Sequence, residues 1–200
     1  MLSSLKSAHN LFCDRRFGIE TVGEYRPVDT SLQRDANRSA PLGYAILARY
    51  IKLLELQPTD TVYDLGCGTG RPLCMIARCD VARCVGVEID AGLAAIARRN
   101  SARLVGRRSE ISIVDADAAA LDYRDGTVFW LYNPFGKRTM TVVLDRIHDG
   151  IKIAPRAVRF CYVTPEAEDA FISCGWLTRY RSVKPLLHPS CTASFWRSSI

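Results

Sequence analysis

A glycine-rich loop between a short apolar run and a helix start constrains the fold of this chain more than any other feature. Thr61–Leu65 is brief and apolar, which is typical of a buried strand. Gly66, Gly68 and Gly70 follow, and Pro72 then opens a helix. Glycine permits positive φ and lets a ligand approach the backbone, while a helix N-terminus offers free N–H groups and partial positive charge. The sequence therefore predicts a strand–loop–helix unit that binds a carboxylate or phosphate.

Beyond this loop the chain alternates between apolar runs and helical patterns. Helices are expected at 91–104, started by Asp90, and at 138–148. Strands are expected at 84–88, 111–114, 128–132 and 157–163, and a closing antiparallel pair at 176–183 and 192–197. Such alternation with nearly continuous apolar strands predicts an α/β fold with a parallel sheet covered on both faces.

Two regions are predicted along the 200 residues. Residues 1–38 are polar and irregular, and we expect them to form an N-terminal arm or lid. Residues 39–200 form one domain, since 48% hydrophobic and 24% charged positions suit an ordinary globular chain. Ser39 is expected to cap a helix whose first turn contains Pro41.

Composition also limits compartment and metal chemistry. Charged residues interrupt every apolar stretch before the roughly 18 to 20 residues that a bilayer span needs, and the N-terminus lacks the apolar core of a signal peptide, so we expect a cytoplasmic protein. The eight cysteines lack zinc-type spacing with the histidines, and we expect reduced, mostly buried thiols and no metal.

An acidic residue supports a nucleoside ligand. Glu88 ends the second predicted strand, where its carboxylate can accept two hydrogen bonds from a ribose diol. Together with the glycine loop this indicates an adenosine-type cofactor. The loop reads G-x-G-x-G instead of the dinucleotide fingerprint G-x-G-x-x-G, which disfavours a nicotinamide-dependent oxidoreductase.

At this point the sequence resembles the class I S-adenosylmethionine (SAM) dependent methyltransferases. Val62–Gly70 looks like their first motif and Val85–Asp90 like their second, within a resemblance that runs from about residue 42 to 163. It implies a three-layer Rossmann-like fold with a seven-stranded, mainly parallel sheet and an antiparallel last strand, with SAM as cofactor and S-adenosylhomocysteine as product. It also implies that Glu88 takes the ribose hydroxyls and that the first motif holds the methionine end of SAM, through Asp64, Gly66, Cys67, Gly68 and Gly70.

The third predicted strand ends in a segment similar to the Gly-Asp-Ala element of the family. This places Asp117 on the adenine amino group and the Ala118 amide near a ring nitrogen. Asp115 is the rival, since it lies two residues away on the same face of a continuing strand. Either aspartate could instead cap the next short helix.

The fourth predicted strand ends in a segment that resembles the Asn/Asp-Pro-Pro-aromatic motif of methyltransferases acting on nitrogen. Tyr132, Asn133, Pro134 and Phe135 are the expected acceptor-site residues, and Phe135 stands where the family has a second proline. Asn-x-Phe together with Gly-Val-Glu is also similar to non-SET histone lysine methyltransferases. Asn133-Pro134 could instead be a strand-ending turn.

We therefore expect a SAM-dependent methyltransferase acting on a nitrogen nucleophile, with a protein lysine in view. The alternatives are a nucleic-acid base, a small-molecule amine, and a non-catalytic SAM-binding module. The net charge of +6 is compatible with nucleic acid. An arginine-rich segment at 98–107 is interpreted as a solvated helix face, and Tyr25 in the arm as a cofactor-site candidate.

Overall fold

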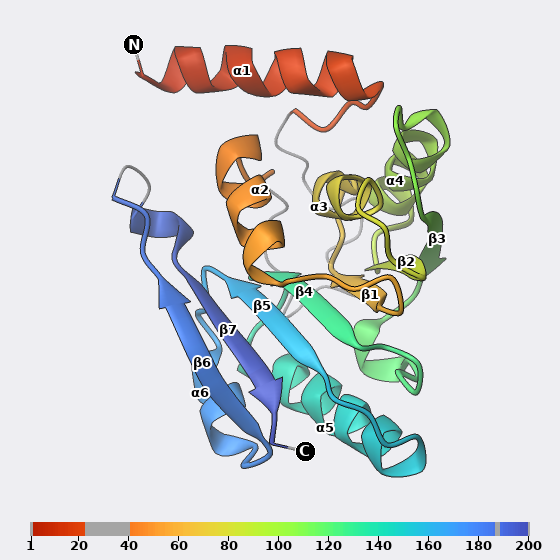
Figure 1. Cartoon of the computed structure of the whole chain (residues 1–200), viewed down its shortest axis with the longest axis vertical. Helices are drawn as coiled ribbons and strands as arrows, with labels where there is room; N and C mark the ends of the chain where they lie inside the picture. The colour runs from red at the N-terminus through yellow and green to blue at the C-terminus, as the bar shows by residue number, and fades with distance from the viewer. Residues whose placement is uncertain (1, 23–40, 187–188, 200) are drawn as a thin grey trace.

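A twisted sheet runs through the middle of the molecule with helices on both sides (Figure 1). The computed structural model describes residues 2–22, 41–186 and 189–199. Within these residues the sheet has seven strands in the order β3-β2-β1-β4-β5-β7-β6. The strands are β1 (Thr61–Leu65), β2 (Arg83–Glu88), β3 (Glu110–Asp115), β4 (Val128–Tyr132), β5 (Arg159–Val163), β6 (Leu177–Val183) and β7 (Ala193–Ser198).

The strand directions match the predicted class. Strands β1 to β5 pair in parallel, and β7 pairs antiparallel with both β5 and β6. The helices are α1 (Leu2–Phe17), α2 (Tyr44–Leu53), α3 (Arg71–Ile76), α4 (Ala91–Arg103), α5 (Lys137–Ile153) and α6 (Glu168–Ser173), with short 3-10 turns η1 (Ala118–Ala120) and η2 (Pro189–Cys191). Figure 1 shows α2, α3 and α4 on one side of the sheet and α5 and α6 on the other. The expected three-layer fold is confirmed.

Two apolar layers hold the sheet between its helices. Neighbouring residues of β4 serve opposite layers, because Phe129 packs on the α5 side and Trp130 on the α2 side. Both side chains are fully buried, and each such burial stabilises the fold by about 1.5–3 kcal/mol. A strand buried on both faces needs apolar residues at consecutive positions, which is why β4 could be recognised from its sequence.

The first helix differs from the irregular arm expected for this region. Residues 2–17 form α1, which lies across the outer side of α2 and α3 (Figure 1). Contacts at its C-terminal end hold it: the Phe17 ring lies 5.6 Å from that of Tyr44, and the Phe17 carbonyl accepts the Val105 N–H at 2.9 Å. Since tertiary contacts fix α1 at one end, its sequence needs no regular apolar stripe.

The second helix begins later than Pro41 suggested. Ser39 and Tyr25 lie outside the described residues, and Gly43 precedes α2 in an extended conformation. The physical reason lies at Leu42, whose carbonyl accepts a hydrogen bond from Arg71 Nη1 at 3.0 Å.

Two later elements also differ from expectation. Helix α5 continues past residue 148 to Ile153, because Gly150 lets it pack against the backbone of Tyr123 and Arg124. Helix α6 has only six residues and was not predicted. No helix in residues 2–22, 41–186 or 189–199 combines the length and apolar character needed to cross a membrane.

Candidate active site

The glycine loop lies between β1 and α3, at the C-terminal edge of the parallel strands. The amides of Gly66 and Cys67 both donate to the Val87 carbonyl, at 2.9 and 3.0 Å, and so anchor the loop to β2. Gly66, Gly68 and Gly70 have φ values of 71°, 54° and 84°. These left-handed conformations explain why glycine stands at all three positions.

The loop also touches the predicted acceptor segment. A Cβ atom added at Gly66 would lie 2.5 Å from the Pro134 Cβ, closer than side chains can approach. The absence of a side chain at Gly66 therefore brings the loop against the end of β4. Cys67 is buried, and its Sγ would lie 2.9 Å from a Cβ added at Gly86, so its thiol packs against β2.

Asp64 places a buried carboxyl group under the loop. The residue is 2% exposed, and its Oδ2 atom has no hydrogen-bond partner among the described residues. Burial, followed by the charge of Glu88, raises the pKa of Asp64 to about 8, against a lowering effect of the Leu73 N–H. An unpartnered buried oxygen is costly on its own, so this site suits a ligand that brings a donor or a cation.

Glu88 holds the loop, a role that the sequence did not reveal, and its binding of the ribose hydroxyls stays a prediction. Its Oε2 accepts the Gly68 N–H at 2.8 Å, and its Oε1 accepts the N–H groups of Ile89 and Asp90 at 3.0 Å each. Burial raises the pKa of Glu88 in spite of these donors. A carboxylate has about four acceptor sites, so Oε2 retains capacity for another donor such as a ribose hydroxyl.

The end of β3 reaches the same edge. The Ala116 amide donates to the Glu88 carbonyl at 3.0 Å, which places this turn beside Glu88. Asp117 accepts the Ala119 N–H at 2.8 Å and so caps η1, whereas Ala118 is buried. Asp115 and Asp117 are both exposed. The capping role suffices to explain Asp117 locally, and its contact with adenine stays a prediction.

The end of β4 carries the expected acceptor residues. Tyr132, Asn133 and Pro134 are half-buried, and Asn133 has a φ of 43°, a conformation that asparagine tolerates better than most residues. Phe135 is 7% exposed and belongs to the apolar layer under α5. Its ring therefore serves the core, and a contact between this ring and an acceptor stays a prediction.

Tyr162 on β5 joins this group and was not predicted. Its hydroxyl donates a hydrogen bond to Asn133 Oδ1 at 3.5 Å and accepts one from the Ala167 N–H at 3.0 Å. The signal that could have found it is topological, because β5 pairs in parallel with β4 and its last residues reach the same edge.

The residues of the site fit SAM, as the sequence resemblance implied. The unpartnered Asp64 oxygen suits a cationic amino group, the three glycines give the loop its left-handed turns, and Glu88 lies at the end of β2. In the part of the chain that the structure describes, no three His, Cys, Asp or Glu side chains gather closely enough to hold a metal ion.

Comparisons of the sequence with known proteins identify relatives of this chain. Residues 62–149 match a family model described as a methyltransferase domain. The 23S rRNA (uracil(1939)-C(5))-methyltransferase of Xanthomonas euvesicatoria is 35% identical over 99 residues, which cover 50% of this chain and 21% of the relative. That of Polynucleobacter necessarius is 29% identical over 184 residues, 88% of this chain and 35% of the relative. The chain thus spans from about a fifth to about a third of these relatives' length.

Solved structures share the fold. An RNA methyltransferase from Salinibacter ruber in complex with S-adenosylhomocysteine has a TM-score of 0.56 at 24% identity, covering 80% of this chain and 92% of the other. A SAM-dependent O-methyltransferase from Thermotoga maritima has a TM-score of 0.61 at 15% identity, covering 82% of this chain and 68% of the other. At such identities the likeness shows the fold alone.

Proposed function

The chain belongs to the class I SAM-dependent methyltransferases, and on this premise we propose that it transfers the methyl group to a nitrogen atom presented at the end of β4. The observation that carries the proposal is the position of Asn133. This half-buried amide follows β4 directly, and its neighbour Pro134 lies against Gly66 of the cofactor loop. An acceptor bound at Asn133 would thus lie beside the loop.

SAM, when bound, supplies a methyl group that its sulfonium already activates. The chain then has to align and desolvate the two reactants. Glu88 fixes the loop through Gly68, and Tyr162 fixes Asn133 through its hydroxyl. The Asn133 amide can accept a hydrogen bond from an acceptor N–H and so orient the nitrogen lone pair.

Replacement of Asn133 tests this assignment. Asn133→Gly removes the amide while keeping the positive φ accessible, and Asn133→Ala removes it with added backbone strain. Both variants should lower kcat by about 10- to 100-fold through lost positioning. The affinity for S-adenosylhomocysteine, measured by calorimetry, should stay within about threefold of the parent, because a change at the acceptor position and binding at the cofactor position are then energetically independent. Weaker affinity with unchanged kcat would instead assign Asn133 to the cofactor.

The chemistry of the thiols supports nitrogen over carbon. The curated relatives are named for transfer to C5 of uracil. A pyrimidine ring carbon requires activation by an attacking nucleophile, commonly a thiolate. Burial raises the thiol pKa of seven cysteines, which disfavours the thiolate: Cys13, Cys67, Cys74, Cys79, Cys84, Cys161 and Cys174.

Cys191 is the remaining thiol. It is half-buried and packs, like Tyr132 at the end of β4, against the apolar layer on the α2 side of the sheet. The nitrogen proposal expects Cys191→Ala to leave turnover unchanged. Loss of turnover in this variant, together with a carbon-bound methyl group in the product, would favour the chemistry for which the relatives are named.

The identity of the acceptor is a separate question that labelling answers. Tritiated SAM added to a lysate with the enzyme, followed by separation into protein, RNA and small molecules, shows where the methyl group goes. A protein lysine acceptor predicts label in methyl-lysine, and an RNA base acceptor predicts label in methylated nucleosides. Label in small molecules alone would support an amine acceptor.

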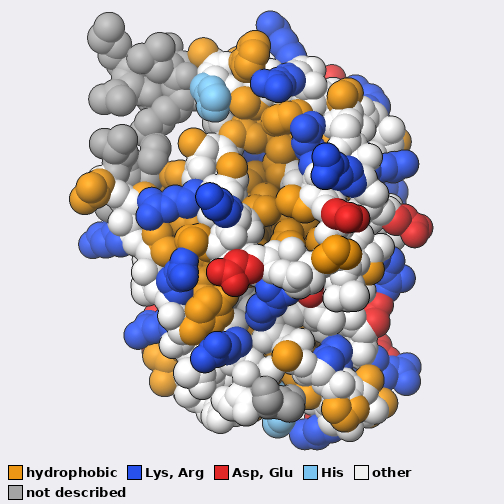
Figure 2. Space-filling model, in the orientation of Figure 1, with side chains coloured by type: hydrophobic (Ala, Val, Ile, Leu, Met, Phe, Trp, Pro, Cys, Tyr) orange, Lys and Arg blue, Asp and Glu red, His pale blue; other side chains and the backbone are white. Residues whose placement is uncertain are grey.

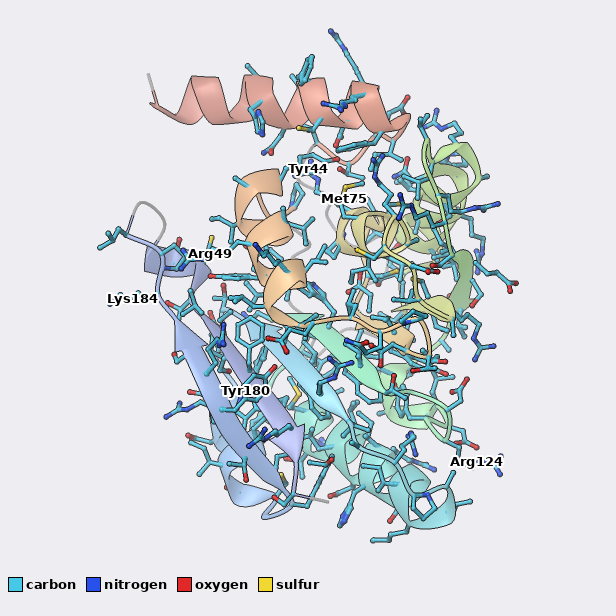
Figure 3. The ribbon with its side chains drawn as sticks, viewed as in Figure 1. Tyr44, Arg49, Met75, Arg124, Tyr180 and Lys184 are labelled. Carbon is cyan, nitrogen blue, oxygen red and sulfur yellow. The ribbon has the colours of Figure 1, made fainter. Side chains whose placement is uncertain are left out.

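One observation favours RNA as the acceptor class. Tyr180 on β6 is half-buried, with the Arg197 guanidinium 5.7 Å from its ring centroid. Figure 2 shows blue Lys and Arg side chains spread over this face with orange side chains between them, and Figure 3 shows Arg49, Tyr180 and Lys184 along α2 and β6. These four residues, the basic surface, combine cationic groups with an aromatic ring, as single-stranded RNA sites do.

The basic surface also leads toward the candidate site. Strand β7 is antiparallel to both β5 and β6, so β6 ends at the same edge of the sheet as β4, and Lys184 follows it there. Lys184→Ala with Arg197→Ala should weaken RNA binding and reduce its salt dependence, the slope falling by about one for each phosphate that is no longer neutralised. Arg107→Ala, an exposed arginine outside this surface, is the matched control.

A further inference from the structure

A buried arginine lies directly behind the glycine loop. Arg71 is the first residue of α3, adjacent to Gly70, and is 1% exposed. Its Nε donates to Thr21 Oγ1 at 2.6 Å, and its Nη2 pairs with Asp14 at 3.4 Å. Asp14 and Thr21 belong to residues 14–22, which we call the docking segment. The cation that begins the cofactor helix is thus neutralised by a carboxylate from the N-terminal region.

The docking segment is itself organised around Asp14. This buried carboxylate accepts the Thr21 N–H at 2.6 Å, the Val22 N–H at 3.0 Å and the Thr21 hydroxyl at 2.9 Å. The Tyr44 hydroxyl also donates to it, and the Arg71 guanidinium lies 4.6 Å from the Tyr44 ring centroid. Removing one member of such a network leaves the other polar groups buried without hydrogen-bond or charge partners. We therefore expect these contacts to form together and to break together.

A second tether reaches the other side of Gly70. Asn100 on α4 is fully buried, and its Nδ2 donates to the Thr69 carbonyl at 2.9 Å. The same amide group donates to the Glu20 carbonyl at 3.0 Å and accepts the Glu20 N–H at 2.9 Å. Residues 69 and 71, which flank Gly70, are therefore linked to the same docking segment through two different side chains.

We propose that Arg71 and Asn100 are positioning residues that couple docking of the N-terminal segment to SAM binding. Gly70 has a φ of 84°, and the two tethers fix the peptides on either side of it. With the segment docked, the loop is held in one conformation; with the segment released, Asn100 loses its bonds to Glu20 and Arg71 loses those to Thr21 and Asp14, so both side chains hold the peptides beside Gly70 less firmly. Because coupling is reciprocal, SAM must stabilise the docked segment by the same factor by which docking strengthens SAM binding. This inference rests on the proposed use of the loop for SAM.

A variant in the segment tests the coupling without touching the loop. Thr21→Val keeps the size of the side chain and removes the hydroxyl that accepts from Arg71 and donates to Asp14. The affinity for S-adenosylhomocysteine, measured by calorimetry, should fall about tenfold, a typical coupling factor. Thr21→Ser keeps the hydroxyl and should recover most of the affinity. Thr178→Val, an exposed residue whose hydroxyl contacts Ser199, is the control and should change nothing.

Hydrogen exchange supplies the second readout. Saturating S-adenosylhomocysteine should slow amide exchange in residues 66–71 and also in residues 18–22, where the Glu20 and Thr21 amides are bonded to Asn100 and Asp14. Protection of the loop alone, or a Thr21→Val variant that loses thermal stability but binds with parent affinity, would overturn the coupling. Absence of both binding heat and loop protection would overturn the SAM assignment itself and the coupling with it.

Discussion

At the scale of single residues, Gly66 is where the glycine loop meets the end of β4. It lies at the end of β1, its backbone is left-handed, and the space a side chain would need is filled by Pro134. Any substitution there therefore carries two separate free-energy costs. The first is the strain of a left-handed backbone, and the second is the collision of the new side chain with Pro134. The sequence motif indicated the first cost, but the second depends on β4 lying beside β1 and is visible only in the fold.

These costs can be separated by a matched pair of variants. Gly66→Ala meets both, whereas Gly175→Ala has a similar φ of 75° with open space around the new Cβ. We expect Gly175→Ala to destabilise the fold by about 1 kcal/mol, the usual cost of a left-handed alanine. Gly66→Ala should in addition weaken S-adenosylhomocysteine binding by at least tenfold, measured by calorimetry. Equal binding by the two variants would contradict a role of the collision.

Asp64 makes stability depend on pH. The unfolded carboxyl titrates near pH 3.8, and burial raises the pKa of the folded one to about 8. Between these values the folded protein holds a proton that the unfolded chain has lost, so raising the pH destabilises the fold. The stabilising effect is complete below pH 3.8 and lost as the pH rises through about 8.

Asp64→Asn removes this titration. Urea unfolding at pH 5, 6.5 and 8 should show the stability of the parent falling relative to the variant by about 1.4 kcal/mol per pH unit, the linkage for one proton. Parallel pH profiles would mean that Asp64 is ionised in the fold throughout this range.

At the scale of elements, strands and their loops followed from sequence better than helices did. The bounds of β1 and β4 were predicted as observed, because buried parallel strands need consecutive apolar residues and end at glycine or asparagine. Helix α4 was also recognised, and Asp90 does cap it by accepting the Leu93 N–H at 2.9 Å. Helix α1 was missed, because the Asp14 network and the Phe17 contacts that stabilise it come from distant residues.

The solvated face of α4 was interpreted correctly for three arginines, but Arg107 lies beyond the helix, which ends at Arg103, and a buried neighbour was overlooked. Arg98, Arg99 and Arg103 are exposed, as expected for an outer helix face. Asn100 lies among them in sequence and is fully buried. Nothing in the local pattern distinguishes an asparagine that points to solvent from one that bonds a loop carbonyl, since the difference lies in the partners at Thr69 and Glu20.

An arginine in the segment after α5 donates hydrogen bonds to several carbonyl groups. Arg156 donates to the carbonyls of Gly126, Gly150 and Ala154 at 2.7, 3.0 and 2.8 Å, and also to that of Tyr123. A guanidinium can serve all four, whereas an ammonium group on a lysine has no matching fork.

This junction predicts a difference between two conservative substitutions. Arg156→Lys should lower the free energy of unfolding by about 2–3 kcal/mol, because half-buried carbonyls lose charged donors. Arg146→Lys changes an exposed arginine of α5 and should cost less than about 0.5 kcal/mol, as surface changes usually do. Chemical denaturation of both variants measures the contrast, and equal losses would contradict it.

At the scale of the whole molecule, the order of the strands explains why function could be inferred from fragments of sequence. Parallel strands β1, β2, β3 and β4 end at one edge, so segments distant in the chain converge there without any sequence signal for their meeting. The segments at the strand ends could be identified from the sequence, whereas only the order of strands in the sheet shows that they lie next to one another. The acceptor had no comparable signal in the sequence. Phe135 stands where the expected motif has a proline, and its side chain belongs to the apolar core.

The thiols give a global test of the fold. All eight cysteines are free, and five of them are buried: Cys13, Cys67, Cys74, Cys84 and Cys161. A reductant should therefore leave the Tm unchanged, and iodoacetamide should label only the half-buried Cys79, Cys174 and Cys191 in the native protein. Mass spectrometry before and after unfolding in urea counts the labelled thiols. Rapid native labelling of Cys161, at the centre of the sheet, would contradict the packing.

The close approach of Gly66 and Pro134 has a consequence for engineering the enzyme. A library that varies only Pro134 to change acceptor preference keeps glycine at position 66. Every variant in it therefore keeps the parent distance between the glycine loop and the end of β4. Smaller residues at position 134, combined with alanine or serine at position 66, would sample geometries that neither single change reaches, and the two positions should show strong epistasis.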